Sequence, residues 1–467
     1  MKINFSTIKK IFLLGFPIII SNLSRTLMDL VDMAMVAGIN DGAKALAAVG
    51  FSGMLTWVVL SMGLSLRTST QTIASRRLGQ EKYLECSLAL RNGQILALCL
   101  GVPLSILGFY FAPEIMTLLI KQNDILSFAI EYSMYSFLAI YFTLCAFVFQ
   151  GFYNAIEMTK IHMKVVIISN IINVYLNAAL IYGTDNISEF LSYYGIQKIS
   201  FLWSIIDFPE LGVMGAGMAT LLSSAFMVVL YISFLFKKNI RQKYDVFNFN
   251  IKAELLKKQT YLAFPLATQE LFSSIGFFLF FKILDMVGTI ELATTNVIFR
   301  IAHASFMPAV GIGQAASTLV GKYIGQNREH KLNDLIFQTI YLSLFIMGTM
   351  GVFFILFPKP IISLFNVPNE IYDLGVPSLQ LIGVLQFFDA VGISLWFICM
   401  GAGDIKFSAI TDCTIIWLVF VPISYILGII YEFGYWGPWI GFSFHIILFA
   451  LIISYRIWSG KWRGIEV

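Results

Sequence analysis

The tetrapeptide Leu-Gly-Phe-Pro at 14–17 recurs 248 residues later as Leu-Ala-Phe-Pro at 262–265. A second pair of segments keeps nearly the same offset, because Asn-Ala-Ile-Glu at 154–157 corresponds to Gly-Ala-Gly-Asp at 401–404. A constant offset over such a distance indicates an internal repeat, which is common in membrane transporters. The sequence therefore predicts two units of similar fold.

Long apolar runs fill both units. The chain is 58% hydrophobic and 12% charged, with a mean hydropathy of +0.80, whereas soluble domains are about 45–50% apolar and about 25% charged. A bilayer span needs about 20 mostly apolar residues, and twelve runs qualify, near 11–38, 46–75, 92–113, 128–154, 163–183, 212–236, 259–287, 292–324, 336–357, 372–400, 406–431 and 436–458. We therefore expect an all-α polytopic membrane protein, with twelve transmembrane helices in two six-helix lobes related by a pseudo-two-fold axis along the membrane normal. The expected domains are an N-lobe at 1–236, a basic cytoplasmic linker at 237–258 and a C-lobe at 259–467.

Basic residues are distributed unevenly around these spans. With both termini in the cytoplasm, 23 of the 31 Lys and Arg residues lie inside, four lie outside and four lie within spans. Because cytoplasmic loops are enriched in Lys and Arg, we expect a multi-pass protein of the plasma or inner membrane with both termini cytoplasmic. The linker carries seven basic residues and is interpreted as a topology determinant, with binding of anionic lipids as the alternative. Its charge does not imply a nucleic-acid partner.

Motifs for nucleotide, protease and metal chemistry are missing from the sequence. The two Gly-Lys pairs, at 321–322 and 460–461, are followed by Tyr and Trp rather than by the Ser or Thr of a phosphate-binding loop. The Gly-Ala-Gly-Asp segment at 401–404 lacks the second acid of an intramembrane aspartyl protease and is interpreted as a turn. The four histidines form no zinc-binding motif. We therefore expect a transporter without a cofactor, and not an enzyme.

Charged residues inside apolar helices are costly, so each one is a candidate functional residue. Arg25 precedes Asp29 by four residues on the first span, and the two are expected to pair. Lys282 and Asp285 are three residues apart near the outer end of the seventh span, where a second pair is expected. A further acid, Asp412, lies in the eleventh span.

Three acids have no local basic partner. Asp32, Glu270 and Asp389 are candidates for cation coupling, because a buried carboxylate can take up a proton or bind a dehydrated cation. Asn173 and Asn177 are four residues apart, so their amides share one helix face and can complete a site around Asp32. Interhelical hydrogen bonding without transport chemistry is the alternative.

Several motifs spread over nearly the whole chain form a set. They are Val-Asp-Met-Ala-Met-Val-Ala-Gly at 31–38, Leu-Ala-Ala-Val-Gly at 46–50, Ala-Ser-Arg-Arg-Leu-Gly at 74–79, Gln-Gly-Phe at 150–152, Pro265 followed by Glu270, and Phe-Asp-Ala at 388–390. This set resembles the multidrug and toxic compound extrusion (MATE) family, and its NorM branch in particular. Members of that family export organic cations and drugs in exchange for Na⁺ or H⁺.

The resemblance implies roles for the candidate residues. By it, Asp32 matches the acid of the first lobe, Asn173 and Asn177 match the polar pair of the fifth span, and Glu270 with Asp389 matches the second-lobe cation site, which holds Na⁺ if the coupling is to sodium. We therefore expect a monomeric antiporter that works by alternating access, opens outward between its lobes and carries an amphipathic small molecule across the bilayer.

Basic residues within the spans leave an alternative open. Arg67, Lys282 and Arg300 stand where the family pattern leads us to expect neutral residues. Basic groups in a central cavity suit a phosphate or carboxylate, so Arg67 and Arg300 favour a flippase or exporter of an anionic lipid-linked substrate, as in related members of the superfamily. Ion pairing with nearby acids is the other interpretation of these residues.

Overall fold

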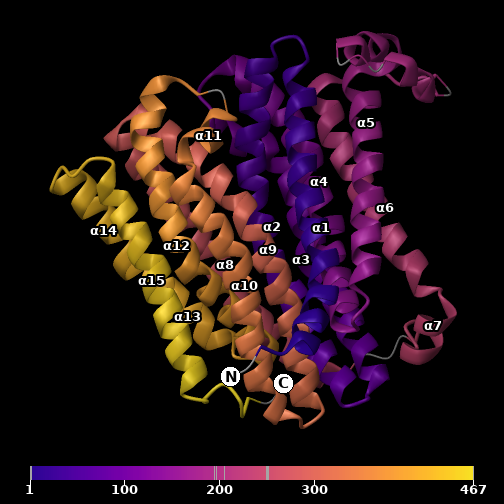
Figure 1. Cartoon of the computed structure of the whole chain (residues 1–467). Coiled ribbons are helices and arrows are strands. Elements are labelled where there is room, and N and C mark those ends of the chain that lie inside the picture. Colours follow the sequence, from indigo (N-terminus) through magenta and orange to yellow (C-terminus); the bar gives the residue numbers. More distant parts are fainter. Residues whose placement is uncertain are drawn as a thin grey trace.

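The computed structural model describes residues 3–193, 195, 197–204, 206–248, 252–365 and 367–465. The described residues form helices and no strands, and twelve long helical segments run through the bundle (Figure 1). In the first half these are α1 (Phe5–Ala37), α2 (Gly42–Gly79), α3 (Tyr83–Leu119), α4 (Asn123–Ala155), α5 (Thr159–Tyr193) and α6 (Gly212–Leu235). In the second half they are α8 (Ala253–Val287), α9 (Thr289–Gly325), α10 (Leu332–Leu356), α12 (Asn369–Ala402), the continuous segment of α13 (Ile405–Ile415), η3 (Ile416–Phe420), α14 (Val421–Tyr425) and η4 (Ile426–Ile430), and α15 (Trp436–Trp458). The short elements are η1 (Gln197–Trp203), α7 (Lys238–Tyr244), η2 (Glu329–Lys331) and α11 (Pro358–Ser363).

The twelve predicted spans correspond one to one with these twelve segments. Ten of the segments are long and apolar enough to cross a membrane on that basis alone, counted over the described residues. The other two are α8 and α9, which carry charged residues such as Glu270 and Arg300. The prediction of a twelve-helix membrane protein is confirmed.

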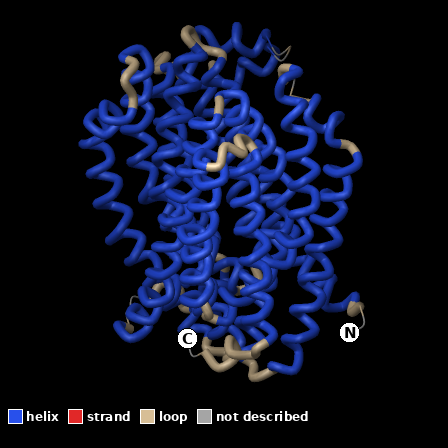
Figure 2. The backbone as a smooth tube through the Cα atoms, turned by 90° about the vertical axis from the view of Figure 1, so that its left-hand side faces the viewer, coloured by secondary structure: helices blue, strands red, loops and turns tan. Residues whose placement is uncertain are grey.

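Helix packing repeats between the two halves of the chain. In the first half α4 packs against α2, α3 and α6, and in the second half its counterpart α12 packs against α9, α10 and α15. Contacts between the two halves are also equivalent. The first helix of the first half, α1, packs on α9, and the first long helix of the second half, α8, packs on α2. Figures 1 and 2 show both sets of helices running nearly side by side along the bundle. The packing thus follows the sequence repeat.

The predicted linker is represented by α7 and its neighbours, and its residues 249–251 lie outside the described part of the chain.

The two lobes meet most closely at the end of the bundle where both termini lie, here called the termini end (Figure 1). A Cβ atom on Gly79 of α2 would lie 2.2 Å from the Lys322 carbonyl oxygen, and one on Gly325 of α9 would lie 2.2 Å from the Arg76 carbonyl oxygen. Glycine at both positions lets the backbones touch, as small residues do in membrane helix pairs. These two glycines therefore fix a close crossing of α2 and α9.

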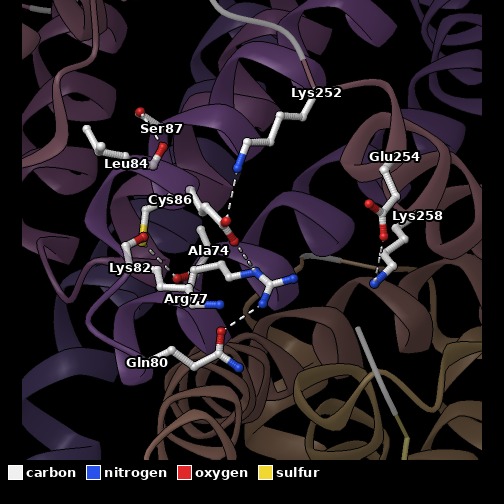
Figure 3. Close-up of polar contacts among 11 residues, drawn as sticks. Ala74, Arg77, Gln80, Lys82, Leu84, Cys86, Ser87, Lys252, Glu254 and Lys258 are labelled. Atoms are coloured by element: carbon white, nitrogen blue, oxygen red, sulfur yellow. Dashed lines mark hydrogen bonds and ion pairs between the residues drawn. The ribbon is translucent and has the colours of Figure 1, made fainter.

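Hydrogen bonds and ion pairs also join the two lobes at the termini end. Thr72 Oγ1 donates to the Met400 carbonyl oxygen at 2.8 Å, and Lys322 Nζ forms an ion pair with Glu157 at 2.6 Å. At the neighbouring corner, the Glu85 carboxylate binds Arg77 Nε at 3.1 Å and Lys252 Nζ at 3.2 Å, so the start of α8 is tied to the N-lobe (Figure 3).

At the opposite end, called the distal end, most of the described residues between 184 and 204 are helical, unlike those of an ordinary outer loop. Helix α5 is kinked at Gly183, whose φ of 70° favours glycine, and then continues helically. Trp203 of η1 stacks on Tyr175 at 5.1 Å and donates from Nε1 to the Tyr175 carbonyl oxygen at 2.9 Å. The segment thereby folds back onto α5 and caps the distal end of the N-lobe.

Candidate functional site

The first candidate site lies in the N-lobe, where α1, α5 and α6 converge on Asp32. The Asn177 Nδ2 group donates hydrogen bonds to Asp32 Oδ1 and, at 3.1 Å, to Asn173 Oδ1. Asn173 Nδ2 in turn donates to Ser223 Oγ of α6 at 2.9 Å. The structure thus brings Asp32, Asn173 and Asn177 together on facing helices, in the arrangement that the four-residue spacing predicts.

Arg25 does not take the position that its spacing from Asp29 predicts. Its guanidinium lies over the Phe147 ring of α4, 5.4 Å from the ring centroid, and it forms no ion pair within 4.0 Å among the described residues. Arg25 and Asp29 therefore form no close ion pair, although the charge of Arg25 still acts on the Asp29 carboxylate, as expected from their spacing. Arg25 and Asp29 are both exposed. An ion pair between exposed, flexible side chains is weak, so a cation–π contact with an aromatic ring can replace it.

The second candidate site lies in the C-lobe. Glu270 of α8 and Asp389 of α12 are half-buried, and within the described part of the chain neither carboxylate accepts a hydrogen bond or joins an ion pair. The charge of Glu270 interacts with that of Arg67 on α2, across the lobe boundary, and the charge of Asp389 interacts with that of His445. Two carboxylates in membrane-spanning helices thus keep their oxygens available for a cation or a proton.

A third acid, Asp412, is bound by side chains of two other helices, and sequence analysis did not predict these partners. Asp412 of α13 accepts hydrogen bonds from Gln269 Nε2 at 2.8 Å and Ser273 Oγ at 3.0 Å, both on α8. Asp412 also lies 3.0 Å from His445 Nε2 of α15, and Phe420 stacks on the imidazole. The one available sequence signal is the four-residue spacing of Gln269 and Ser273, which places two polar groups next to Glu270 on one helix face.

A metal centre of the usual kind is not formed around these residues. Within the described residues, no group of three or more His, Cys, Asp or Glu side chains is placed to hold a metal ion. A coupling Na⁺ at Glu270 or Asp389 would need carbonyl, hydroxyl or water oxygens for its remaining ligands.

The other charged residues in the spans separate into paired and unpaired groups. Lys282 Nζ binds Asp285 Oδ2 at 2.7 Å, as predicted. Arg67 Nε is buried without a hydrogen-bond partner in the described structure, and Arg300 is exposed on α9. Asp404 of the 401–404 turn binds Arg456 Nε at 2.7 Å, which agrees with its interpretation as a structural residue.

Comparisons with known proteins agree with the repeat and with the fold. The sequence model of the MatE family matches residues 17–179 and again residues 265–426. A probable multidrug resistance protein NorM of Thermotoga maritima is 28% identical, over 97% of this chain and 93% of its own length.

Solved structures show the same architecture. An outward-facing multidrug resistance MATE transporter of the MOP superfamily superposes with a TM-score of 0.84 at 22% identity, covering 97% of each chain. A MOP superfamily transporter from Pyrococcus furiosus superposes with a TM-score of 0.85 at 21% identity, covering 98% of this chain and 97% of that one. Both halves of the sequence match the family model and the whole fold matches its solved members, so the chain belongs to the MatE family of membrane transporters, the multidrug and toxic compound extrusion proteins, which are not enzymes.

Proposed function

We propose that this protein is a cation-coupled antiporter that exports drugs or other amphipathic organic cations by alternating access. The observation that carries the proposal is the pair of half-buried carboxylates, Glu270 and Asp389, which accept no hydrogen bond and form no ion pair within 4.0 Å among the described residues. An unpaired carboxylate in a membrane helix is costly unless a proton or a cation neutralises it during the cycle. The names of the curated relatives, multidrug resistance proteins, support the substrate class.

The lobe contacts support an outward-facing state. The side-chain hydrogen bonds between the lobes, such as those from Thr72 and from Gln71 Nε2 to Thr318 Oγ1 at 2.9 Å, join the termini ends of the helices. The excess of basic residues on that side supports a cytoplasmic location for it, in the plasma or inner membrane. Rocking of the lobes about this seal would then open and close the path to the outside.

Coupling follows from competition for negative charge. With Na⁺ or H⁺ bound, the negative charges of Glu270 and Asp389 are neutralised, and the cationic substrate is released outward. Without the coupling ion, the carboxylates are free to balance the charge of a new substrate taken from the inside, while Asp32 with Asn173 and Asn177 contributes a polar surface in the N-lobe. The pair of domains at 1–236 and 259–467 forms the two moving bodies of this scheme.

The test is transport in proteoliposomes under separately imposed Na⁺ and proton gradients. A cationic dye should accumulate in the proteoliposomes when an outward-directed gradient of Na⁺ or of protons is imposed. Collapse of that gradient should stop the transport. Transport that proceeds at the same rate with neither gradient would contradict coupling.

A second candidate, export or flipping of an anionic lipid-linked substrate, is favoured by the unpartnered Arg67 Nε and the exposed Arg300. The Pyrococcus furiosus transporter is described as having a binding pocket of reverse polarity that suggests a different function. If the substrate is a cation, Arg300→Gln should leave dye export unchanged or faster, and Arg67→Gln should change export only through the interaction of Arg67 with Glu270. If both variants lose binding of a phosphorylated lipid instead, the substrate is anionic.

A further inference from the structure

An apolar groove runs between α8 and α13 in the C-lobe. Its volume is about 1040 Å³, and its walls include Tyr261, Phe264, Phe272, Ile410, Trp417 and Leu418. Two of these side chains are among the most exposed apolar groups of the described structure, with Phe264 at 71% and Leu418 at 72% exposure. Walls of this kind exclude water and suit a hydrocarbon chain. Because both helices span the membrane, acyl chains of the bilayer can enter the groove.

The mouth of the groove is positively charged. Lys257 of α8 and Lys406 at the start of α13 both line its termini end. Both side chains are exposed, and within the described part of the chain neither forms an ion pair, whereas the adjacent Lys258 lies 3.8 Å from Glu254. Two free ammonium groups over an apolar slot match an amphiphile with an anionic head.

The length of the groove matches one leaflet of a bilayer. Along α8, the rise from Lys257 to Phe272 is about 22 Å at 1.5 Å per residue. A bilayer with its headgroups is about 40–45 Å thick, so one leaflet spans about the same length. The basic mouth also lies on the side where Lys and Arg accumulate, and the cytoplasmic leaflet facing such residues is the anionic one.

We propose that this groove is a specific binding site for one anionic glycerophospholipid. Its phosphate lies between Lys257 and Lys406, and an acyl chain runs along Phe264 to Phe272 on α8 and Trp417 on η3. The groove adjoins the Asp412 cluster, because Phe272 and Cys413 line it while their neighbours Ser273 and Asp412 bind each other. The lipid therefore bridges the two helices that hold the Asp412 cluster. This inference requires only that the helices span a membrane, and not that transport is ion-coupled.

Trp417 provides a direct test. The full-length protein, purified in detergent and delipidated, is titrated with phosphatidylglycerol that carries brominated acyl chains, and in parallel with brominated phosphatidylcholine. Phosphatidylglycerol should quench the tryptophan fluorescence at a lower mole fraction, and the difference between the two lipids should disappear in Trp417→Phe. Equal quenching by both lipids, or a difference that persists in Trp417→Phe, would overturn the proposal.

The charge of the mouth is tested with the double variant Lys257→Gln/Lys406→Gln. Each lysine near an anionic headgroup contributes about fivefold in affinity, so phosphatidylglycerol retention, measured by native mass spectrometry, should weaken about 30-fold. The matched control is Lys160→Gln/Lys164→Gln, two exposed lysines of α5 at the same end of the N-lobe, which should retain the lipid. Retention by both double variants, or loss by both, would show unspecific attraction to the basic face and refute the site. This readout does not depend on transport and does not require Trp417→Phe to fold.

Discussion

The candidate acids of the N-lobe and the C-lobe differ in their hydrogen bonding. In the N-lobe, Asp32 is bound by Asn177, which is itself held by Asn173 and through it by Ser223. In the C-lobe, Glu270 and Asp389 have no such partners among the described residues. Amide donors hold a carboxylate in one position, whereas an unpartnered carboxylate in a membrane helix keeps its oxygens available for a cation or a proton. We infer that the repeated fold has divided its work, with binding and positioning in the first lobe and coupling in the second.

The C-lobe adds a contrast of its own. Asp412 accepts hydrogen bonds from α8, where Gln269 directly precedes Glu270, and contacts His445 of α15. Because Asp412 holds α8, α13 and α15 together, it can keep Glu270 in place without taking part in the exchange of ions. The difference between Asp412 and Glu270 thus separates a structural charge from a candidate coupling charge.

The sharpest way to break this comparison is to neutralise the free acids. Glu270→Gln or Asp389→Asn should reduce gradient-driven efflux to background in proteoliposomes while the protein stays folded, because an amide neither exchanges a proton nor balances a dehydrated cation. Asp373→Asn, which changes an exposed acid on the same helix as Asp389, is the control and should transport normally. Wild-type coupled uptake by either of the first two variants would remove the C-lobe acids from the mechanism.

Asp412→Ala should lower the free energy of unfolding, and its main effect should not be on ion coupling. The variant leaves the buried donors of Gln269, Ser273 and His445 unpaired, and breaking a buried charged network typically costs about 3–5 kcal/mol. The free energy of unfolding, followed by denaturant titration in detergent micelles, should fall by about that amount, and Asp373→Ala should change it little. A stable Asp412→Ala protein that loses only ion coupling would place Asp412 among the coupling acids instead.

The N-lobe cluster should give a graded effect. A hydrogen bond to a charged group contributes about 1.5–3 kcal/mol, which corresponds to about 10- to 100-fold in binding. Asp32→Asn should therefore weaken substrate binding about tenfold or more, and Asn173→Ala/Asn177→Ala should do the same, because it removes the Asn177 donor of Asp32 and the Asn173 side chain that holds Asn177. The control is Asn170→Ala on the same helix, whose Nδ2 donates to Ser24 Oγ at 2.8 Å outside the cluster. Normal binding of every tested substrate by Asp32→Asn would leave Asp32 a purely structural role.

The sequence predicts what depends on a single helix or on the repeat. Apolar runs define the twelve spans, because each membrane helix satisfies its own backbone hydrogen bonds and has to be apolar along its length. The contact of Asn173 and Asn177 with each other follows from their four-residue spacing. The pairing of Lys282 with Asp285 follows in the same way from a three-residue spacing.

Contacts between helices are harder to predict. The Asp412 cluster joins α8, α13 and α15, which are far apart in sequence, so no spacing rule applies to it. Arg25 shows the same limit, because its contact with Phe147 on α4 depends on the packing of α1 against its neighbours. The kink at Gly183 and the ordered cap that follows also depend on tertiary contacts, such as the Trp203 stack on Tyr175.

The smallest effect is expected at the Lys282–Asp285 pair. This pair tests whether every charge in a C-lobe span is needed for efflux, or only the charges without a partner. If the pair predicted from the sequence were buried in the membrane, removing Lys282 would cost about 3–5 kcal/mol. In the structure the two side chains are 58% and 42% exposed, and an exposed ion pair contributes about 0–1 kcal/mol. Lys282→Gln should therefore lower the free energy of unfolding by no more than about 0.5 kcal/mol and leave efflux unchanged. If Lys282→Gln instead matched Glu270→Gln in abolishing efflux, the division between partnered and free charges would fail, since a base already neutralised by its neighbour would then be as important as a carboxylate that has none.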